Sequence, residues 1–323
     1  MGQEGKTAGF DAARILRYKE LPLIILIVVG SIALSFASRN FLNISNILAV
    51  FLGASFDTLV AIGMTLLLIS GGFDLSVGST FAFGGVITGI MLTAGADVVL
   101  SVIGGLAAGA LVGFVNGIII ARVKVNPLIT TLATMSIVRG LVFIITRGLG
   151  IPNLPAAFNV IAQTRVYQIQ TPIIIMVIVL ILSDIFFRFS IFFRQYFFIG
   201  GNEESARLSG IKVDPLKILG YTFSGFMAAV AGILSAARMG GALSTAGTGS
   251  ELTVITACII GGCSLAGGEG SVLGSFLGVL LMALVANAFN LLGVSIYWQR
   301  AIYGLILLGA VLVDVVRRRR MEG

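Results

Sequence analysis

The sequence predicts an all-α, polytopic membrane protein of about ten transmembrane helices, with both termini cytoplasmic and a glycine-rich packed bundle that contains broken helices. Three observations lead to this fold class. Hydrophobic residues make up 57% of the 323 residues and charged residues only 11%. Apolar runs recur along the whole length, each near the roughly 20 residues that a helix needs to cross a bilayer core. Lys and Arg gather in alternate connections between these runs.

Ten apolar runs are the candidate transmembrane helices, and the eighth of them is short and glycine-rich. They cover residues 21–37, 47–69, 77–94, 98–121, 127–146, 172–187, 216–236, 252–266, 272–292 and 297–316. We expect one transmembrane domain over 21–316, between a cytoplasmic segment 1–20 and a basic cytoplasmic tail 317–323. The first run lacks a small-residue cleavage site, so it is expected to be a retained helix and not a signal peptide.

The distribution of basic residues predicts the orientation, because short cytoplasmic loops collect Lys and Arg. With a cytoplasmic N-terminus, fifteen of the 21 basic residues fall on the inner side. They precede the first run, lie at Arg122 and Lys124, lie between Arg188 and Lys217, or belong to the tail. The other six are scattered over outer loops and helix ends. One helix more or fewer would spoil this segregation.

Two connections are longer than a turn. The outer one, about 147–171, carries Pro152 and Pro155 and is expected to be an ordered external loop. The inner one, about 188–215, is polar and charged and is the candidate cytoplasmic coupling loop.

Glycine recurs at every fourth position in two of the expected helices. One set is Gly105, Gly109, Gly113 and Gly117, and the other is Gly270, Gly274 and Gly278. Residues four apart lie on one face of a helix, and small residues there let membrane helices approach closely. We interpret both faces as helix-packing surfaces and not as the lining of a pore.

The composition excludes several kinds of chemistry. The chain has no histidine and only two cysteines, Cys258 and Cys263, so zinc sites, His-dependent triads and disulfide frameworks lack their parts. The Gly-x-x-x-x-Gly-Lys-Ser/Thr phosphate loop does not occur in the sequence, so any energy from ATP must come from another chain. We expect no catalytic residue, no metal, no cofactor bound by this chain and no nucleic-acid partner.

Residues 71–79 interrupt the apolar pattern between the second and third expected helices. Backbone freed by glycines at membrane depth is tolerated only inside protein or beside a watery cavity. Asp74 and Ser76 either cap the start of the third helix or line a polar path. The segment also resembles Gly261-Gly262-Cys263-Ser264-Leu265 at the end of another run, a similarity that could arise by chance.

Further polar residues lie inside apolar runs, where they either line a path or form hydrogen bonds between helices. These residues are Asn116, Arg139, Asp184, Asn287, Asn290 and Arg300. Arg139 and Asp184 could also reach the membrane interface. Our candidates for the lining of a translocation pathway are Asp74, Ser76, Asn116, Asn287 and Asn290.

The core of the inner loop, residues 200–211, predicts a short surface helix. Asn202 can cap its start, and Glu203 and Glu204 suit the positive end of a helix and can pair with Arg207. Gly210 can end the turn. The residues alone do not decide between an ordinary solvated helix and a docking element.

Several blocks of the sequence resemble the ribose-type permeases of bacterial ATP-binding-cassette sugar importers, in the same order and over nearly the full length. They are Gly63 to Leu66, Gly72 to Ser79, Thr131-Leu132 with Arg139-Gly140, Gly200 to Ile211, Ala246 to Gly249 with Glu251-Leu252, Gly261-Gly262 with Ser264 to Gly268, and Asn290 to Val294. The resemblance implies a permease without enzymatic activity, in a bacterial inner membrane, for a monosaccharide such as a pentose, a hexose or a related polyol.

It also implies partners: a second permease copy, an ATPase subunit with two nucleotide-binding domains that holds ATP and magnesium, an external solute-binding protein, and membrane lipid. In such importers a short cytoplasmic helix docks on the ATPase. The matching residues here are Asn202, Glu203, Glu204, Ser205, Ala206, Arg207 and Gly210. A nucleoside or furanosyl signalling molecule as cargo, or a self-sufficient secondary transporter, are the alternatives.

Overall fold

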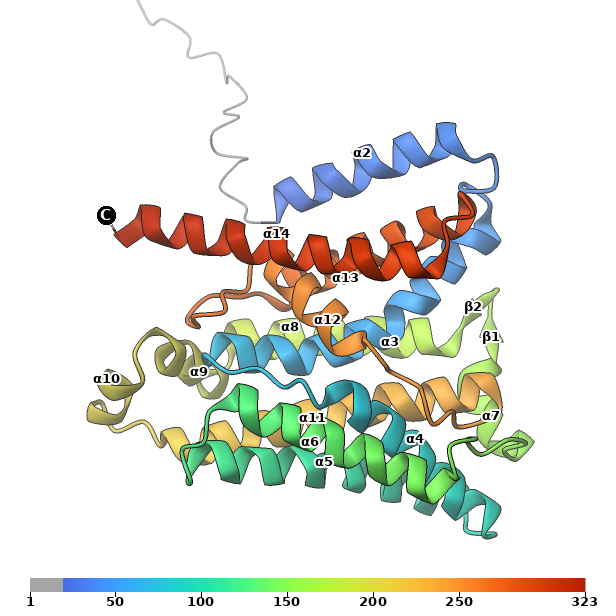
Figure 1. Cartoon of the computed structure of the whole chain (residues 1–323), viewed down its shortest axis with the longest axis horizontal. Helices are drawn as coiled ribbons and strands as arrows, with labels where there is room; N and C mark the ends of the chain where they lie inside the picture. The colour runs from blue at the N-terminus through green and yellow to red at the C-terminus, as the bar shows by residue number, and fades with distance from the viewer. Residues whose placement is uncertain (1–19, 323) are drawn as a thin grey trace, which may run out of the picture.

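A computed structural model describes residues 20–322, a bundle of helices with one small hairpin (Figure 1). The expected N-terminal segment, apart from Glu20, lies outside the described residues, as do Gly323 and the side chains of Ile296, Arg300 and residues 317–322. The helices are α2 (Leu21–Ala37), α3 (Ile44–Ile69), α4 (Val77–Thr93), α5 (Val98–Ala121), α6 (Pro127–Thr146), α7 (Ala156–Gln163), α8 (Thr171–Phe189), α9 (Ile191–Gly201), α10 (Glu203–Leu208), α11 (Val213–Met239), α12 (Ser250–Ile260), α13 (Val272–Leu291) and α14 (Ile296–Glu322). Strands β1 (Arg165–Val166) and β2 (Ile169–Gln170) pair antiparallel.

Each of the ten expected ranges overlaps one helix. Seven helices are long and apolar enough to cross a membrane, namely α3, α5, α6, α8, α11, α13 and α14. The other three, α2, α4 and α12, are shorter apolar helices. The chain is therefore a polytopic helical membrane protein, while the count of ten crossings and the side of the termini stay predictions.

Local capping explains where several helices begin. Asp97 accepts a hydrogen bond from the backbone N–H of Val99 at 2.8 Å, at the start of α5. Asn126 does the same for the N–H of Leu128 at 2.8 Å, and Pro127 is the first residue of α6. Such residues satisfy backbone donors that a helix start leaves open. They set helix boundaries that the sequence alone can predict.

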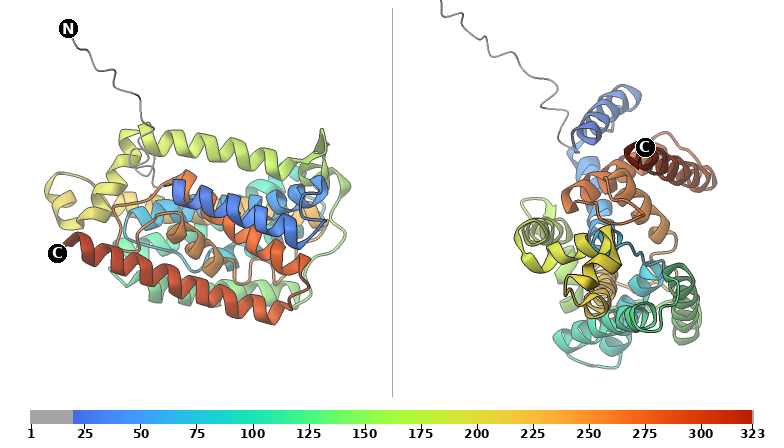
Figure 2. Two further views of the ribbon diagram at one scale, coloured as in Figure 1. Left: turned by 90° about the horizontal axis from the view of Figure 1, so that it is seen from above. Right: turned by 90° about the vertical axis from the view of Figure 1, so that its left-hand side faces the viewer.

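The centre of the bundle is formed by α11 and α3. About 67% of the most apolar window of α11 is buried, against none of the corresponding window of α14. Helices α2 and α14 lie on the outside of the bundle (Figure 2). Exposed apolar side chains on such outer helices are expected in a membrane protein, where they contact lipid and not water.

The four glycines of α5 face α11 and α4. A Cβ at Gly113 would lie 2.1 Å from the carbonyl oxygen of Tyr221, and one at Gly109 would lie 2.6 Å from that of Gly225. On α13, a Cβ at Gly278 would lie 1.9 Å from the carbonyl oxygen of Ala257 in α12. These backbones approach so closely that only glycine fits.

One of the ten expected ranges needs correction. The eighth was expected over 252–266, but α12 ends at Ile260, since Gly262 takes a φ of +94° that L side chains rarely adopt. Gly270, expected on the packing face of the ninth helix, lies just before α13 begins. Residues 70–76 after α3 and 261–271 after α12 are therefore non-helical backbone within the apolar part of the chain.

The two long connections contain structure of their own. The outer one holds α7 and the β1–β2 hairpin, and Ile151 pairs with Ala242 through backbone hydrogen bonds of 2.8 Å in both directions. The inner one holds α10, as predicted, and also α9, which the sequence did not predict because α9 is apolar but too short to cross a bilayer.

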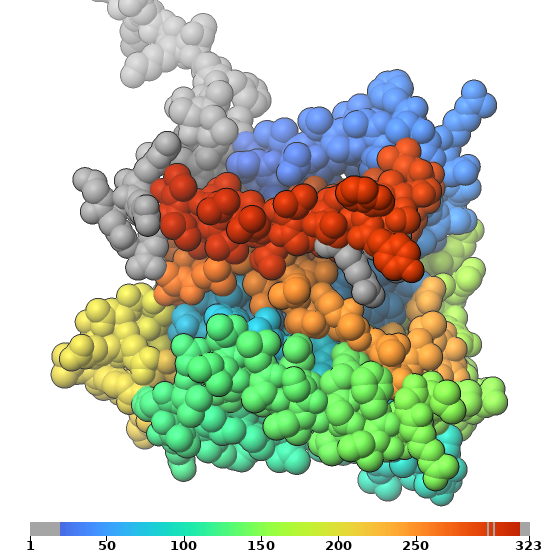
Figure 3. All heavy atoms as spheres, in the orientation of Figure 1, coloured from blue at the N-terminus to red at the C-terminus, as the bar shows by residue number. Residues whose placement is uncertain are grey.

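Between α14 and α6, one face of the molecule displays α12 (Figure 3).

Candidate functional site

Helix α10 lies at one end of the bundle, next to α9 and the beginning of α11 (Figure 1). The Asn202 side chain accepts a hydrogen bond from the N–H of Ser205 at 2.8 Å and so caps the helix. Gly210, with a φ of +85°, follows its end. The short helix is therefore defined by local sequence, as expected for residues 202–210.

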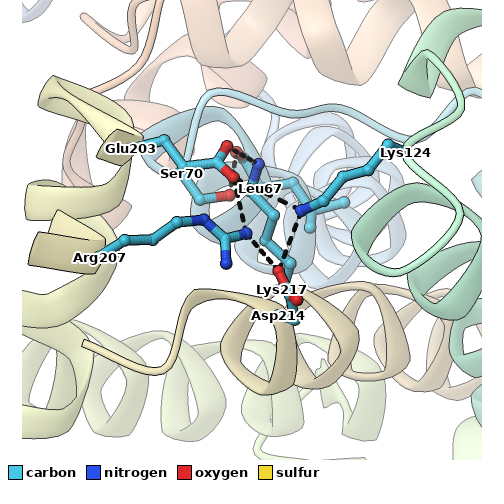
Figure 4. A network of polar contacts seen from close by, with 7 residues as sticks. All are labelled: Leu67, Ser70, Lys124, Glu203, Arg207, Asp214 and Lys217. Carbon is cyan, nitrogen blue, oxygen red and sulfur yellow. Dashed lines mark hydrogen bonds and ion pairs between the residues drawn. The ribbon is translucent and has the colours of Figure 1, made fainter. Parts of the chain in front are cut away.

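Five charged side chains hold α10 against the body, and we call them the α10 charge cluster: Lys124, Glu203, Arg207, Asp214 and Lys217 (Figure 4). Arg207 Nη2 lies 3.0 Å from Glu203 Oε1 and also bonds Asp214. Lys217 bonds the other oxygen of Glu203. Lys124 Nζ lies 3.0 Å from Asp214 and 3.7 Å from Glu203. The cluster joins α10, α11 and the α5–α6 connection.

The cluster favours the charged forms of its members. Burial works against the charge of Glu203, but hydrogen bonds from Lys217 and Arg207 outweigh it and hold the pKa of Glu203 below its ordinary value. A hydrogen bond to Asp214 raises the pKa of Arg207. The side chains are between 18% and 52% exposed, so each pair alone contributes little and the connected set matters more.

The opposite face of α10 points away from the body. Leu208 is 84% exposed, whereas Ala206 is 3% exposed and packs inward. Glu204, Ser205 and Ser209 are exposed as well. The candidate coupling residues thus divide into an inner set that fastens the helix and an outer set that is free to contact a partner. The sequence did not reveal this division.

Behind α10, three backbone segments meet without side chains between them. Gly268 N donates a hydrogen bond to Ile69 O at 2.9 Å. A Cβ at Gly200 would lie 1.8 Å from that same oxygen, and a Cβ at Gly267 would lie 2.9 Å from the Cα of Gly71. We call this contact of Gly71, Gly200, Gly267 and Gly268 the glycine junction. It connects the end of α9 with both helix breaks.

The residues expected to cap α4 or to line a path form one buried network. Asp74 Oδ1 accepts hydrogen bonds from the N–H of Ser76 at 2.8 Å and from its hydroxyl at 2.5 Å. Asn116 donates to Ser76 Oγ at 3.0 Å, and Thr134 donates to Asn116 Oδ1 at 2.6 Å. Asp74, Ser76 and Asn116 are at most 1% exposed. The network links the first break to α5 and α6.

The other two pathway candidates lie on α13. Asn287 and Asn46 of α3 exchange hydrogen bonds of 2.7 and 3.1 Å between their amides. Asn290 accepts one from Gln299 at 3.4 Å. Asn46 was not among the predicted pathway residues because the expected helix began at residue 47. A polar residue at the end of an apolar run is the signal that could have found it.

Arg139 of α6 binds three backbone carbonyls. Its Nη1 donates to Ser244 O and Ala246 O and its Nη2 to Gly78 O, all at 2.9 Å. Glu251 lies on the other side of Gly78, with Oε2 buried and without a hydrogen-bond partner among the described residues. The sequence reading did not single out Glu251. Arg139 thereby ties α4 and α6 to the loop before α12.

Asp184 forms an ion pair with Arg188, one turn later on α8, at 2.8 Å. Among residues 20–322, no group of three or more His, Cys, Asp or Glu side chains is arranged to hold a metal ion. Cys258 and Cys263 are free and buried.

The sequence is similar to known transport permeases over most of its length. Residues 43–311 match the profile of a family described as "Branched-chain amino acid transport system / permease component". The chain is 36% identical to the ribose import permease protein RbsC of Escherichia coli K12 over 94% of its own length and 95% of that protein. It is 38% identical to the L-arabinose transport system permease protein AraH of the same organism, over 98% and 96%. The RbsC protein of Bacillus subtilis is 37% identical, over 96% of both chains. No solved structure matches.

Proposed function

Because this chain belongs to that family of transport permeases, whose members are membrane components and not enzymes, we propose that it imports a monosaccharide as part of an ATP-binding-cassette importer. The named cargo of its relatives supports this choice, since ribose and L-arabinose permeases align with it almost from end to end. A ribose-like pentose, a hexose or a related polyol fits best. The proposed location is the bacterial inner membrane.

The proposed assembly has two permease copies, an ATPase subunit with two nucleotide-binding domains, and a solute-binding protein outside. ATP and magnesium would be held by the ATPase. Solute would cross by alternating access, in which ATP binding favours one of two permease conformations.

The observation that carries the coupling proposal is the exposed face of α10. Leu208 is 84% exposed at the end of the bundle and lies beside the exposed side chains of Glu204 and Ser209, while the opposite face of α10 is held on the body. In this proposal Leu208 and Glu204 contact the ATPase, while Glu203 and Arg207 are positioning residues that hold α10 on α11.

A route for the motion is supported by the glycine junction. Gly200 follows the aromatic stretch of α9 and touches Ile69 and Gly268, so displacement of α10 would press on both helix breaks. Non-helical backbone at membrane depth must be covered by protein or face a watery cavity. We therefore propose that the translocation pathway lies beside these breaks, next to the buried network of Asp74, Ser76 and Asn116.

Transport by the reconstituted complex tests the cargo. Proteoliposomes that contain the permease, its ATPase and its binding protein should accumulate labelled ribose or arabinose only with ATP. Uptake of a nucleoside in preference to sugars would show that the transported solute is a nucleoside and not a monosaccharide. Sugar transport by the permease alone, driven by an ion gradient, would contradict the proposal of an ATP-driven importer.

Asp74 allows a separate test of the pathway. Asp74→Asn keeps the oxygen that accepts from Ser76 but removes the charge, whereas Asp74→Ala also removes the cap. Normal transport and assembly of the Asn variant would take Asp74 off the pathway. Assembly that fails in the Ala variant alone would assign it to capping.

A further inference from the structure

A cavity of about 280 Å³ lies where the end of α8, helix α9 and the beginning of α13 meet. It is separate from the exposed face of α10 and from the Asp74 network. Its lining includes Asp184, Phe187, Arg188, Arg194, Phe197 and Ser271.

The neighbouring elements place this cavity at the level of the membrane interface. Helix α8 is long and apolar enough to span a membrane, and Arg188 lies in its last turn. The chain then turns at Ser190 into α9. The aromatic residues of α9 are Phe192, Phe193, Tyr196, Phe197 and Phe198. Aromatic rings that accompany arginine are typical of the interface between head groups and hydrocarbon.

Three exposed apolar side chains lie close in sequence to lining residues of α8 and α9. Phe189 is 75% exposed, Ile191 is 80% exposed and Phe198 is 63% exposed. In a bilayer these side chains contact acyl chains. A molecule in the cavity could therefore be polar at one end and apolar at the other.

The lining carries two arginines and one carboxylate. Arg188 Nε binds Asp184 Oδ2 at 2.8 Å, which leaves further donors of its planar guanidinium unused. Arg194 has no ion pair among residues 20–322. Two further acids adjoin lining residues: Glu20 accepts a hydrogen bond from Ser271 at 3.3 Å, and Glu269 directly precedes Gly270. Guanidinium groups bind phosphate oxygens in pairs of parallel hydrogen bonds.

We propose that this cavity binds the phosphodiester head group of an anionic phospholipid through Arg188 and Arg194. The volume of about 280 Å³ accommodates a head group, while the acyl chains lie along Phe189 and Ile191. The inference rests on the proposed function only for the leaflet, which is the cytoplasmic one because α10 follows α9 directly. Basic pockets between membrane helices on that side suit anionic lipids.

The chain's own terminal segments are less suitable occupants. Residues 1–19 carry Lys6, Arg14, Arg17 and Lys19, and the tail carries Arg317 to Arg320. Both segments are net basic and would bring like charge to two arginines. Charge complementarity therefore favours a lipid phosphate.

Lipid binding to the purified full chain in neutral detergent tests the proposal. Dioleoyl phosphatidylglycerol should raise the thermal unfolding midpoint more than dioleoyl phosphatidylcholine and should be retained in native mass spectra. Arg194→Gln should weaken phosphatidylglycerol binding about fivefold, the effect expected for one basic residue near a membrane surface. Arg188→Gln should do the same. The matched control is Arg165→Gln, in exposed strand β1 at the other end, which should change nothing.

Asp184→Asn should change the affinity for phosphatidylglycerol in the opposite direction. It removes the carboxylate that competes for Arg188, so phosphatidylglycerol should bind more tightly by a similar factor. Raised salt should weaken binding to the native chain.

Equal binding of both lipids, or an unchanged Arg194→Gln variant, would overturn the proposal. Protection by inorganic phosphate alone, equal to that by the lipid, would assign the cavity to a soluble anion instead. The assay contains neither ATPase nor sugar, so failure of the transport proposal leaves its outcome untouched. An Arg194→Gln variant could lose phosphatidylglycerol binding and still import solute normally. That result would support the lipid site and show that import does not depend on it.

Discussion

Adjacent glutamates on α10 have different surroundings. Glu203 contacts Lys124, Arg207 and Lys217, whereas Glu204 is exposed. An ion pair in such a cluster contributes about 1 kcal/mol at most when it is half exposed. The main role of Glu203 is therefore to position α10, because it fixes the direction in which the outer face of the helix points.

Substitution of these two residues should separate positioning from contact. Glu203→Gln should lower the stability of the isolated permease by about 1 kcal/mol and weaken ATPase co-purification through a displaced helix. Glu204→Gln should leave the stability of the isolated permease unchanged and weaken only the complex. Thermal unfolding and co-purification measure the two effects. Equal behaviour of both variants in both assays would contradict the assignment.

The lowered pKa of Glu203 predicts a pH dependence. A carboxylate with a lowered folded-state pKa contributes stability above its ordinary value of 4.5, and this contribution is lost as the pH falls through the lowered pKa. Protection of α10 from hydrogen exchange should therefore be constant from about pH 8 to pH 5 and fall below that range. In Glu203→Gln this fall should be smaller, and what remains should come from Asp214, whose pKa is also lowered, chiefly by its hydrogen bond from Arg207. A fall that begins near pH 6 would contradict the role of Glu203.

At the scale of the elements, the two helix breaks depend on contacts that join distant parts of the chain. Residues 70–76 and 261–271 meet through Ile69, Gly267 and Gly268. The short similarity between residues 71–75 and 261–265 thus belongs to two segments that lie together in space. Each break gives up helical hydrogen bonds, and the contact between them supplies some of the missing partners.

The glycine junction offers a matched pair of substitutions. A Cβ at Gly200 would lie 1.8 Å from Ile69 O, while a Cβ at its neighbour Gly201 would have nothing within 4 Å. Gly200→Ala should therefore displace α9 and reduce transport-coupled ATP hydrolysis severalfold. Gly201→Ala should be neutral or stabilise α9 by up to about 1 kcal/mol, since alanine favours a helix. ATPase activity with and without solute measures the coupling, and equal effects of both variants would remove the junction from the mechanism.

At the scale of the whole molecule, the ends of the bundle differ in chemistry. One end contains α10, its charge cluster and the beginning of α11, and the other contains α7 and the β1–β2 hairpin (Figure 1). Seven basic residues of the described chain lie in the α5–α6 connection and between Arg188 and Lys217, towards the α10 end. The positive-inside rule predicts that this end is cytoplasmic.

Labelling of single cysteines should test this orientation. Tyr167 in the hairpin is 97% exposed and Leu208 on α10 is 84% exposed. Tyr167→Cys should react with a membrane-impermeant thiol reagent in intact cells, and Leu208→Cys should react only after permeabilisation. The native cysteines are buried and should stay unlabelled. The reverse pattern would invert the predicted topology and the leaflet of the lipid site.

By itself, the sequence determined the helical membrane class, the approximate ranges of most apolar helices and the short capped helix at 203–208. These features depend on interactions within one or two turns, such as runs of apolar residues, the Asn202 cap and the glycine after the helix. Family membership was also readable, because it rests on ordered blocks of residues.

The tertiary structure alone decided which polar residues face inward, which of two glutamates is free, and that both breaks touch α9. The partners in these contacts lie far apart in the sequence: Lys217 follows Glu203 on the next helix, and Gly268 binds Ile69 across some two hundred residues. Local patterns carry no information about such pairs, because packing of the whole bundle brings them together. The cavity between α8, α9 and α13 arises in the same way.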